Sequence, residues 1–261
     1  MPKSPQHKWY ETWFDSPHYH RLYGHRNTKE ASTFIKGLHH KFGWKRLQLL
    51  DLACGKGRHS AAAAELGHSV VGMDLSPNSI ADAKKIHTGT SNLRFVEGNM
   101  LDFDLGERFD GVLNLFTSFG YFDNLSDHLA VLKGIRHHLN VDGFLILDFL
   151  NVEFSLARLI PSETLNRGGV DYIISRSFGD LGHGIPGFIK TIEFEEDGTL
   201  YSFTERVSGM DRVALTSLLS ETGFVVFDTF GNYDLSDWKP KESPRLILCA
   251  RALDTGFSSP M

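Results

Sequence analysis

A glycine-rich turn near residue 50 is the first place where this chain could hold a ligand. In the segment Leu49–Ser60 (LLDLACGKGRHS), Asp51 lies near the end of a short apolar run, and Gly55 and Gly57 fall in the turn. Glycine lets the backbone come close to a ligand, and a following helix offers free N–H groups. A dinucleotide fingerprint has a third glycine where this chain has Ser60. The turn therefore predicts a nucleotide-type site, but not a pyrophosphate site or a NAD-dependent dehydrogenase.

Three later segments place polar side chains after further apolar runs. Asp74 could accept hydrogen bonds from both hydroxyls of a ribose, or it could cap a helix, although Ser76 also suits the cap. Glu97–Met100 could flank an adenine ring with a polar and a flat apolar side chain, and Asn114–Ser118 ends the next run. All of them fall at predicted carboxyl ends of strands, where open α/β sheets bind ligands.

The elements that must position these residues alternate along the chain. Strands are expected at 46–52, 69–74, 93–97, 111–116 and 143–149, and helices at 30–42, 60–66, from Ser76, and from about 126 to 139. Such alternation predicts a parallel sheet with helices on both faces, and nearly continuous apolar strands fit a sheet covered on both sides.

The alternation stops after Leu150. Three runs between about Asp171 and Val207 alternate polar and apolar residues and are separated by Gly-rich turns, which predicts a small antiparallel sheet. A helix at 211–222 and strands at 224–230 and 245–251 then complete the main domain. The expected fold is α/β, with a seven-stranded, mostly parallel, doubly wound sheet and an inserted antiparallel β cap.

The expected division of the chain follows from these elements. It comprises a helical arm or lid over residues 1–44, a Rossmann-like domain over 45–150 and 208–254, the cap over 151–207, and a disordered tail over 255–261. Residues 1–50 carry nine Lys/Arg and three Asp/Glu (+6), whereas the whole chain has a net charge of −5. The arm is either an amphipathic helix pair packed on the main domain or a basic, aromatic lid over a ligand.

Composition narrows the possible partners. No apolar run approaches the ~20 residues of a membrane span, and the first residues lack an apolar signal core, so a cytoplasmic protein without membrane contact is expected. The acidic net charge makes nucleic acid an unlikely general partner. Cys54 and Cys249 have no metal-ligand spacing, the paired histidines lack a carboxylate at ligand spacing, and no metal is expected.

The turn DLACGKG, Asp74, Asn99 and the segment FDGVLNLFTSFGYF at 109–122 together resemble the motifs of class I S-adenosylmethionine-dependent methyltransferases. The resemblance covers roughly residues 45–150. It departs from the pattern at Ala53, where many members have glycine. The strand-rich insertion is similar in layout to the cap of small-molecule members such as glycine and amino-sugar N-methyltransferases.

This resemblance implies S-adenosylmethionine as cofactor and S-adenosylhomocysteine as product. It implies Asp51 near the methionine amino group, Asp74 on the ribose, and Asn99 and Met100 around the adenine. An N-terminal aromatic or arginine side chain often closes over the cofactor, with candidates Tyr19, Arg21, Tyr23 and Arg26. The expected cofactor-binding residues are Asp51, Ala53, Cys54, Gly55, Gly57, Asp74, Leu75, Asn99, Met100, Asn114, Leu115, Phe116, Tyr19 and Arg26.

The expected activity is methyl transfer to N or O of a small polar molecule by a monomer or homodimer. The protein would align the acceptor, methyl group and sulfur and exclude water; a hydroxyl acceptor needs a general base, and no catalytic residue is assigned. Candidate substrate contacts are Tyr19, Phe119, Tyr121, Arg176 and Tyr233.

Two alternatives stay open, and two acceptor classes are disfavoured. The chain could methylate RNA or a modified nucleoside with its basic arm, or it could bind S-adenosylmethionine or S-adenosylhomocysteine without catalysis. A C5-pyrimidine enzyme needs a nucleophilic cysteine near the fourth strand, and neither cysteine falls there. Enzymes acting on exocyclic amines usually show Asn-Pro-Pro-Tyr where this chain has Asn114-Leu-Phe-Thr.

Overall fold

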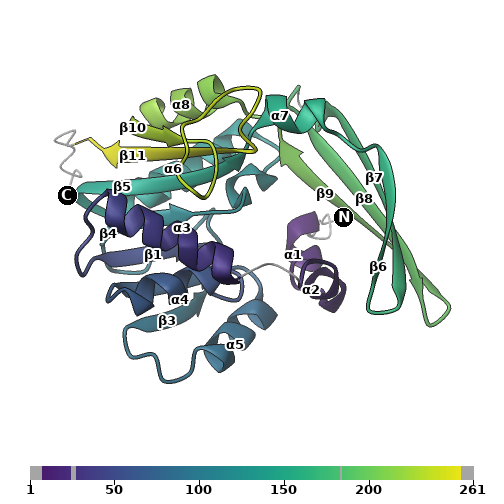
Figure 1. The fold of residues 1–261 in the computed structure, drawn as a ribbon, viewed down its shortest axis with the longest axis horizontal. Helices are drawn as coiled ribbons and strands as arrows, with labels where there is room; N and C mark the ends of the chain where they lie inside the picture. The colour runs from purple at the N-terminus through teal and green to yellow at the C-terminus, as the bar shows by residue number, and fades with distance from the viewer. Residues whose placement is uncertain (1–7, 25–27, 183, 254–261) are drawn as a thin grey trace, which may run out of the picture.

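Five parallel strands form the centre of the main sheet in this computed structural model, which describes residues 8–24, 28–182 and 184–253 (Figure 1). The strand order is β10-β11-β5-β4-β1-β2-β3. Strand β11 runs antiparallel to both of its neighbours, and the other pairings are parallel. The strands are β1 Gln48–Leu52, β2 Ser69–Asp74, β3 Leu93–Glu97, β4 Phe109–Asn114, β5 Leu139–Leu150, β10 Phe224–Phe230 and β11 Arg245–Ala252.

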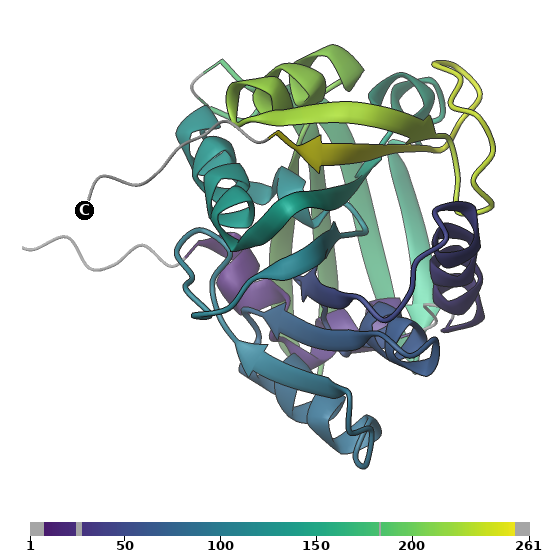
Figure 2. The ribbon, with the colours of Figure 1, turned by 90° about the vertical axis from the view of Figure 1, so that its left-hand side faces the viewer.

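Helices cover both faces of this sheet, as Figure 2 shows with α6 on one side and α3 on the other. One hydrophobic cluster joins α3 (Thr28–Lys41) and α4 (Arg58–Glu65) to the sheet, and another joins α6 (Leu125–His138) and α8 (Arg212–Glu221) to the opposite face. Helix α5 (Pro77–Ile86) packs beside β3, and the single-turn η1 (Ser118–Tyr121) follows β4. The predicted fold class, a seven-stranded mostly parallel sheet with helices on both faces and a separate antiparallel sheet, is confirmed.

Local sequence signals explain several boundaries. Ser76 accepts a hydrogen bond from Ser79 N at 3.0 Å, and Pro77 is the first residue of α5, as predicted. Strand β5 begins at Leu139, directly after α6, rather than at Gly143. The polar stretch before Gly143 and a register irregularity against β4 hide this first part of the strand from a search for continuous apolar residues.

The inserted sheet has four strands rather than the predicted three. Its order is β6-β7-β8-β9, all antiparallel, with β6 Ser162–Arg167, β7 Val170–Asp180, β8 Pro186–Glu196 and β9 Thr199–Ser208, and a short helix α7 (Val152–Ala157) precedes it. Strand β6 (SETLNR) was missed because it is an edge strand with no fully buried side chain, so its sequence carries little apolar alternation.

The first two helices, α1 (Trp9–Trp13) and α2 (Pro17–Tyr23), lie between the main sheet and the cap (Figure 1). A separate hydrophobic cluster joins Trp13 and Leu22 of these helices to Tyr172, Ile192 and Phe194 of the cap. The helices thus pack on the cap and also on the main domain, because Tyr10 of α1 belongs to a hydrophobic cluster of the main sheet. The tail expected to be disordered, residues 255–261, lies outside the described residues.

Candidate functional site

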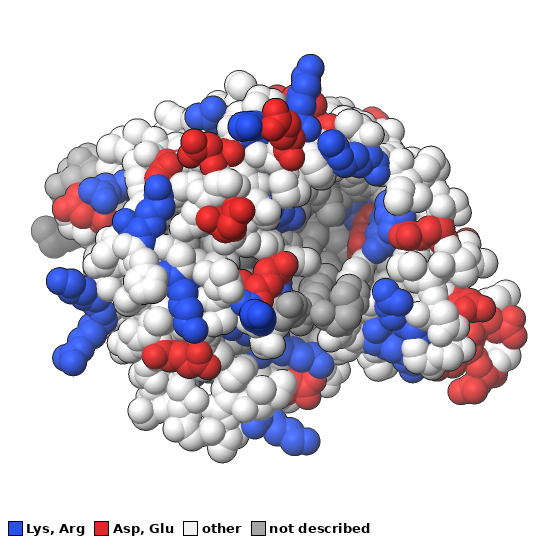
Figure 3. Space-filling model, in the orientation of Figure 1, with Lys and Arg blue, Asp and Glu red and all other residues white. Residues whose placement is uncertain are grey.

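A cavity of about 370 Å³ lies between the carboxyl ends of the central strands and the helices α1 and α2. Figure 3 shows the surface hollowed between the main domain and the cap. Its walls come from the turn after β1, the ends of β2 and β4, the segment after β3, and aromatic side chains of α1 and α2. Since parallel strands deliver their carboxyl ends to one edge, the polar groups of several segments converge here.

Several residues of the turn after β1 have a left-handed backbone conformation. Ala53, Gly55 and Gly57 have φ values of 65°, 56° and 78°. Ala53 therefore sits where glycine would cost less strain. A Cβ on Gly57 would lie 2.4 Å from the Phe95 ring, so Gly57 is required by packing beneath the turn.

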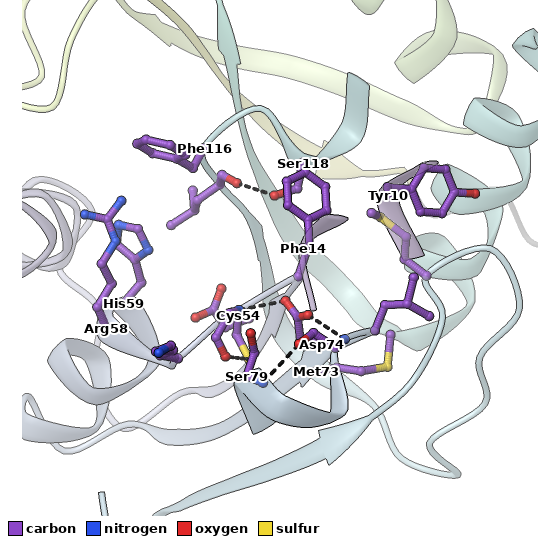
Figure 4. A pocket seen from close by; sticks show the side chains of 18 of the residues that line it. Tyr10, Phe14, Cys54, Arg58, His59, Met73, Asp74, Ser79, Phe116 and Ser118 are labelled. Atoms are coloured by element: carbon purple, nitrogen blue, oxygen red, sulfur yellow. Dashed lines mark hydrogen bonds between the residues drawn. The ribbon is translucent and has the colours of Figure 1, made fainter. Parts of the chain in front are cut away.

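Asp74 ties this turn to the next helix. Its carboxylate accepts hydrogen bonds from Gly55 N at 2.7 Å and from Ser76 N at 2.9 Å, while its side chain also lines the cavity (Figure 4). Burial raises the pKa of Asp74, and the backbone donors partly offset that effect. The residue is therefore both a structural acceptor and part of the cavity wall, so the two interpretations of Asp74 do not exclude each other.

Asp51 is a second buried carboxyl group on the same wall. It is 1% exposed and accepts a hydrogen bond from Ser60 Oγ at 2.5 Å. Burial raises the pKa of Asp51 to about 6. Ser60 therefore has a structural task that glycine could not perform, because it holds the Asp51 carboxyl group at the cavity.

The segment after β4 is bent by two consecutive non-glycine residues, Phe116 and Thr117, with φ values of 63° and 68°. Such residues are uncommon in this conformation and need support from their surroundings. Here the support is Asp148 of β5, whose carboxylate accepts from Phe116 N at 2.8 Å and whose carbonyl accepts from Thr117 N at 2.9 Å.

Asp148 is fully buried and lies at the centre of a larger network. Arg245 Nε donates to it at 2.7 Å, and Tyr233 Oη donates to it at 2.9 Å. Arg245 also donates to Thr117 Oγ1 at 2.8 Å. The pKa of Tyr233 is raised by burial and by Asp148, so its hydroxyl stays protonated as a donor. Together these groups fix the position of the Phe116 ring at the cavity.

The arm closes the opposite wall. Phe14, Tyr19 and Tyr23 line the cavity, and Asp15 between α1 and α2 accepts from Ser76 Oγ at 2.6 Å and from Asn78 N at 3.0 Å. These contacts anchor the arm to the first turn of α5, beside Asp74.

On its other side the arm is bound to the cap. Glu205 Oε1 accepts from Trp13 Nε1 and from Tyr23 Oη, both at 2.7 Å. Lys190 contacts both Tyr23 and Glu205. The arm is therefore connected to both sides of the hollow.

Comparisons with known proteins relate part of this chain to methyltransferases. The family model described as "Methyltransferase domain" matches residues 49–143. The chain is 36% identical over 124 residues to a ubiquinone biosynthesis O-methyltransferase of Cereibacter sphaeroides. The matched region covers 46% of this chain and 48% of that protein. It is 28% identical over 124 residues to a dTDP-3-amino-3,6-dideoxy-alpha-D-glucopyranose N,N-dimethyltransferase of Streptomyces fradiae, covering 48% and 46%. The chain thus spans about half the length of these curated relatives.

The solved structure of the CcbJ methyltransferase from Streptomyces caelestis is similar over nearly the whole chain. Its TM-score is 0.75 at 16% identity, with 93% of this chain and 98% of that chain covered, which shows a shared fold. Residues 49–143 thus match a methyltransferase domain, and the chain has the class I methyltransferase fold.

Most of the residues predicted to bind the cofactor line the cavity described above. They are Asp51, Ala53, Cys54, Gly55, Asp74, Leu75, Asn99, Met100, Leu115, Phe116 and Tyr19, and the candidate substrate residue Tyr121 joins them. Asn114 is buried behind this wall, where its amide donates to Leu52 O at 3.1 Å. Arg26 lies outside the described residues.

The other candidates lie elsewhere. Phe119 is fully buried, and Tyr233 is bound to Asp148. Arg176 pairs with Glu163 within the cap and does not line the cavity. Arg21 pairs with Glu196. None of these four side chains belongs to the described wall of the cavity.

Sequence reasoning missed several residues at or behind this wall. They are Tyr10, Phe14, Arg58, His59, Asp148 and Arg245. One signal was available: Asp148 lies within the apolar strand FLILDFL, and a buried carboxylate needs a partner.

Among residues 8–24, 28–182 and 184–253, no three His, Cys, Asp or Glu side chains are grouped as metal ligands. No helix in the same ranges is long and apolar enough to cross a membrane.

Proposed function

We propose that this chain is an S-adenosylmethionine-dependent methyltransferase that acts on N or O of a small polar molecule. The observation that carries the proposal is the cavity at the ends of β1, β2 and β4, with Asp51 and Asp74 on its floor and aromatic rings of the arm above. The volume of about 370 Å³ falls in the range of small-molecule sites.

The residues of the cavity suit such a cofactor. Asp74 lies at the end of β2, where its carboxylate can accept hydrogen bonds from ribose hydroxyls, and Asp51 can pair with an ammonium group. Asn99 and Met100 offer a polar and an apolar side chain to an adenine ring. The cavity wall thus carries groups suited to the ribose, the ammonium group and the adenine of the cofactor.

The bound cofactor would supply an activated methyl group on a sulfonium. This chain's own residues would bind, orient and exclude water. Asp148 accepts from Phe116 N and Arg245 donates to Thr117 Oγ1, which keeps Phe116 at the cavity, and the arm covers the cavity with Phe14 and Tyr19.

A small acceptor is favoured over RNA. The cavity is enclosed by the arm, which is attached both to α5 through Asp15 and to the cap through Glu205. The curated relatives are named for ubiquinone biosynthesis and for a nucleotide-linked amino sugar, and both are small-molecule enzymes with O and N acceptors respectively. Binding to RNA would instead weaken about 10³-fold or more from 50 to 200 mM salt if several phosphates were contacted.

The test is to incubate the purified protein with S-adenosylmethionine labelled in the methyl group and a fractionated metabolite extract, and to identify the product by mass. We expect label in a small metabolite, and none when S-adenosylhomocysteine is added in excess. Binding of S-adenosylmethionine without transfer to any fraction would mean a non-catalytic binding protein. Label in RNA with steep salt dependence would mean a nucleic-acid enzyme.

A further inference from the structure

We propose that the imidazole rings of His39 and His68 form a pH-sensitive switch, which fastens the end of α3 to the main domain only while both rings are neutral. His39 lies in the last turn of α3, and His68 lies between α4 and β2. Neither residue belongs to the described wall of the cavity, so this inference stands independently of the proposed function.

The two rings belong to a chain of hydrogen bonds that begins at the backbone. Leu47 N donates to His68 Nδ1 at 3.0 Å, and His68 Nε2 lies 3.0 Å from His39 Nδ1. Because Nδ1 of His68 accepts from the amide, the ring proton of neutral His68 must be on Nε2, from which it is donated to His39 Nδ1. The proton of neutral His39 is then on its own Nε2. The backbone amide thus determines one neutral tautomer for each ring.

A further proton has no place in this arrangement. Adding it to His68 would put a proton on Nδ1, which would then face the N–H of Leu47. Adding it to His39 would put a proton on Nδ1, which would then face the Nε2–H of His68. In either case a hydrogen bond is replaced by two donors that point at each other, and a buried donor without an acceptor is costly.

The surroundings of His68 do not compensate for a positive charge. The residue is fully buried, and its ring packs edge-to-face against Trp44 with the two centroids 5.9 Å apart. Its backbone contacts are to neutral groups, since its N donates to Ala63 O at 3.3 Å and its carbonyl accepts from Asn92 Nδ2 at 2.7 Å. Burial and the adjacent His39 lower the pKa of His68.

His138 shows what this site lacks. It is also buried, and its Nε2 accepts from a backbone amide at 3.1 Å, but Asp104 lies 3.6 Å from the same nitrogen and can pair with an added proton. A third titratable ring near the pair is the exposed His40, whose centroid lies 5.4 Å from that of His39. In the part of the chain that the structure describes, no carboxylate forms an ion pair with His39 or His68.

The pair joins segments that support the main sheet. His39 belongs to α3, whose Phe34 and Leu38 pack in the hydrophobic cluster on this face of the sheet. Leu47 directly precedes β1, and its carbonyl accepts from Ser69 N at 2.9 Å at the start of β2. The apolar contacts of α3 do not depend on protons, so we expect acid to release its last turn and the Leu47 amide while the rest of the helix stays packed.

The direction of the pKa shift determines the pH range. The folded-state pKa of His68 lies below its ordinary value of 6.5, so the attachment has its full strength above about pH 6.5 and loses it as the pH falls further. Acidification therefore opens the switch.

The first test measures the protonation of the ring nitrogens in the wild type. Long-range proton–nitrogen correlation NMR at about pH 7.5 should show both rings neutral, with the proton of His68 and the proton of His39 each on Nε2. A proton on Nδ1 of His68, or a charged ring at that pH, would overturn the proposal.

The second test follows the Leu47 amide by hydrogen exchange. Its protection, corrected for the intrinsic pH dependence of exchange, should fall about tenfold or more from about pH 7 to pH 5, because the released rings take up protons near pH 6.5. In His68→Asn the side-chain oxygen can accept from Leu47 without titrating, so the protection should change less than about threefold over this range. His40→Asn, at the exposed neighbour, should behave as the wild type.

Constant protection of Leu47 in the wild type would contradict the proposal. An equal fall in His68→Asn would contradict it too, because another group would then control the end of α3. If His68→Asn does not fold, the ring nitrogens and the wild-type exchange decide the question alone. Neither experiment includes a ligand, so a negative result here leaves the proposed function unaffected.

Discussion

The two walls of the cavity are built in different ways. The wall formed by the main domain consists of strand ends and tight turns, held by backbone hydrogen bonds to Asp74 and Asp148. The wall formed by the arm and cap consists of aromatic rings and partly buried charges, joined by contacts such as Trp13 with Glu205 across 192 residues of chain. In the proposed function, the first wall would hold the cofactor and the second would border the methyl acceptor.

The largest effect should come from the buried network of the main-domain wall. Arg245→Ala leaves the fully buried Asp148 without its cation and should lower the free energy of unfolding by about 3–5 kcal/mol. Urea denaturation measures it, with Arg251→Ala, an exposed arginine of the same strand, as the control within about 0.5 kcal/mol. A loss below about 1 kcal/mol would show that the network does not stabilise this wall.

Asp74→Ala tests the same wall at the ligand. The affinity for S-adenosylhomocysteine should fall by about 1–3 kcal/mol because ribose hydroxyls lose a desolvated acceptor. Calorimetry measures it, and the exposed Asp104→Ala should bind as wild type. Unchanged affinity would reduce Asp74 to its structural contacts with Gly55 and Ser76.

The pH dependence of binding follows from Asp51. Its pKa of about 6 in the ligand-free protein means that it is increasingly protonated below that pH, whereas an ammonium group needs the carboxylate. Affinity for S-adenosylhomocysteine should therefore fall by up to about tenfold per pH unit below 6 and be level above 7. Asp51→Asn should bind more weakly and lose this part of the slope. A wild-type affinity that is constant from pH 5 to 7 would contradict the role of Asp51.

The stability of the fold depends on pH in the opposite direction to the ligand affinity. Because the folded-state pKa of Asp51 is raised, its contribution to stability is present below the unfolded pKa and is lost as the pH rises through about 6. The free energy of unfolding of the wild type should therefore fall between pH 4 and 6, and Asp51→Asn should not show this part of the fall. Urea denaturation at several pH values in that range measures it.

The smallest effect belongs to the attachment of the arm. Asp15→Asn weakens the contacts to Ser76 and Asn78 and should cost about 1 kcal/mol of arm docking, seen as faster proteolysis within residues 8–24. Lys8→Ala, which removes the partly exposed pair with Asp127 and a contact with the Tyr10 ring, should change the rate little. Equal rates for both variants and wild type would mean that Asp15 does not anchor the arm.

The sequence made the main-domain wall predictable because its signals are local. Apolar runs, the glycines after β1 and the Ser76-Pro77 start of α5 lie within a few residues of what they determine. The long-range partners were not predictable: Asp148 and Arg245 are 97 residues apart, and nothing in either segment identifies the other. Strand β6 depends on its pairing with β7, and the position of the arm depends on packing against the cap; local sequence patterns encode neither contact.

The division of labour between the walls is tested most directly by comparing Asp74→Ala with Glu205→Ala. Both are assayed for S-adenosylhomocysteine affinity by calorimetry and for transfer of labelled methyl to the metabolite product. We expect Asp74→Ala to lose affinity, and Glu205→Ala to keep it within about threefold while transfer falls about tenfold or more, because Trp13 and Tyr23 lose their acceptor and the acceptor wall shifts. Loss of cofactor affinity in Glu205→Ala as large as in Asp74→Ala, or full transfer by Glu205→Ala, would contradict this account.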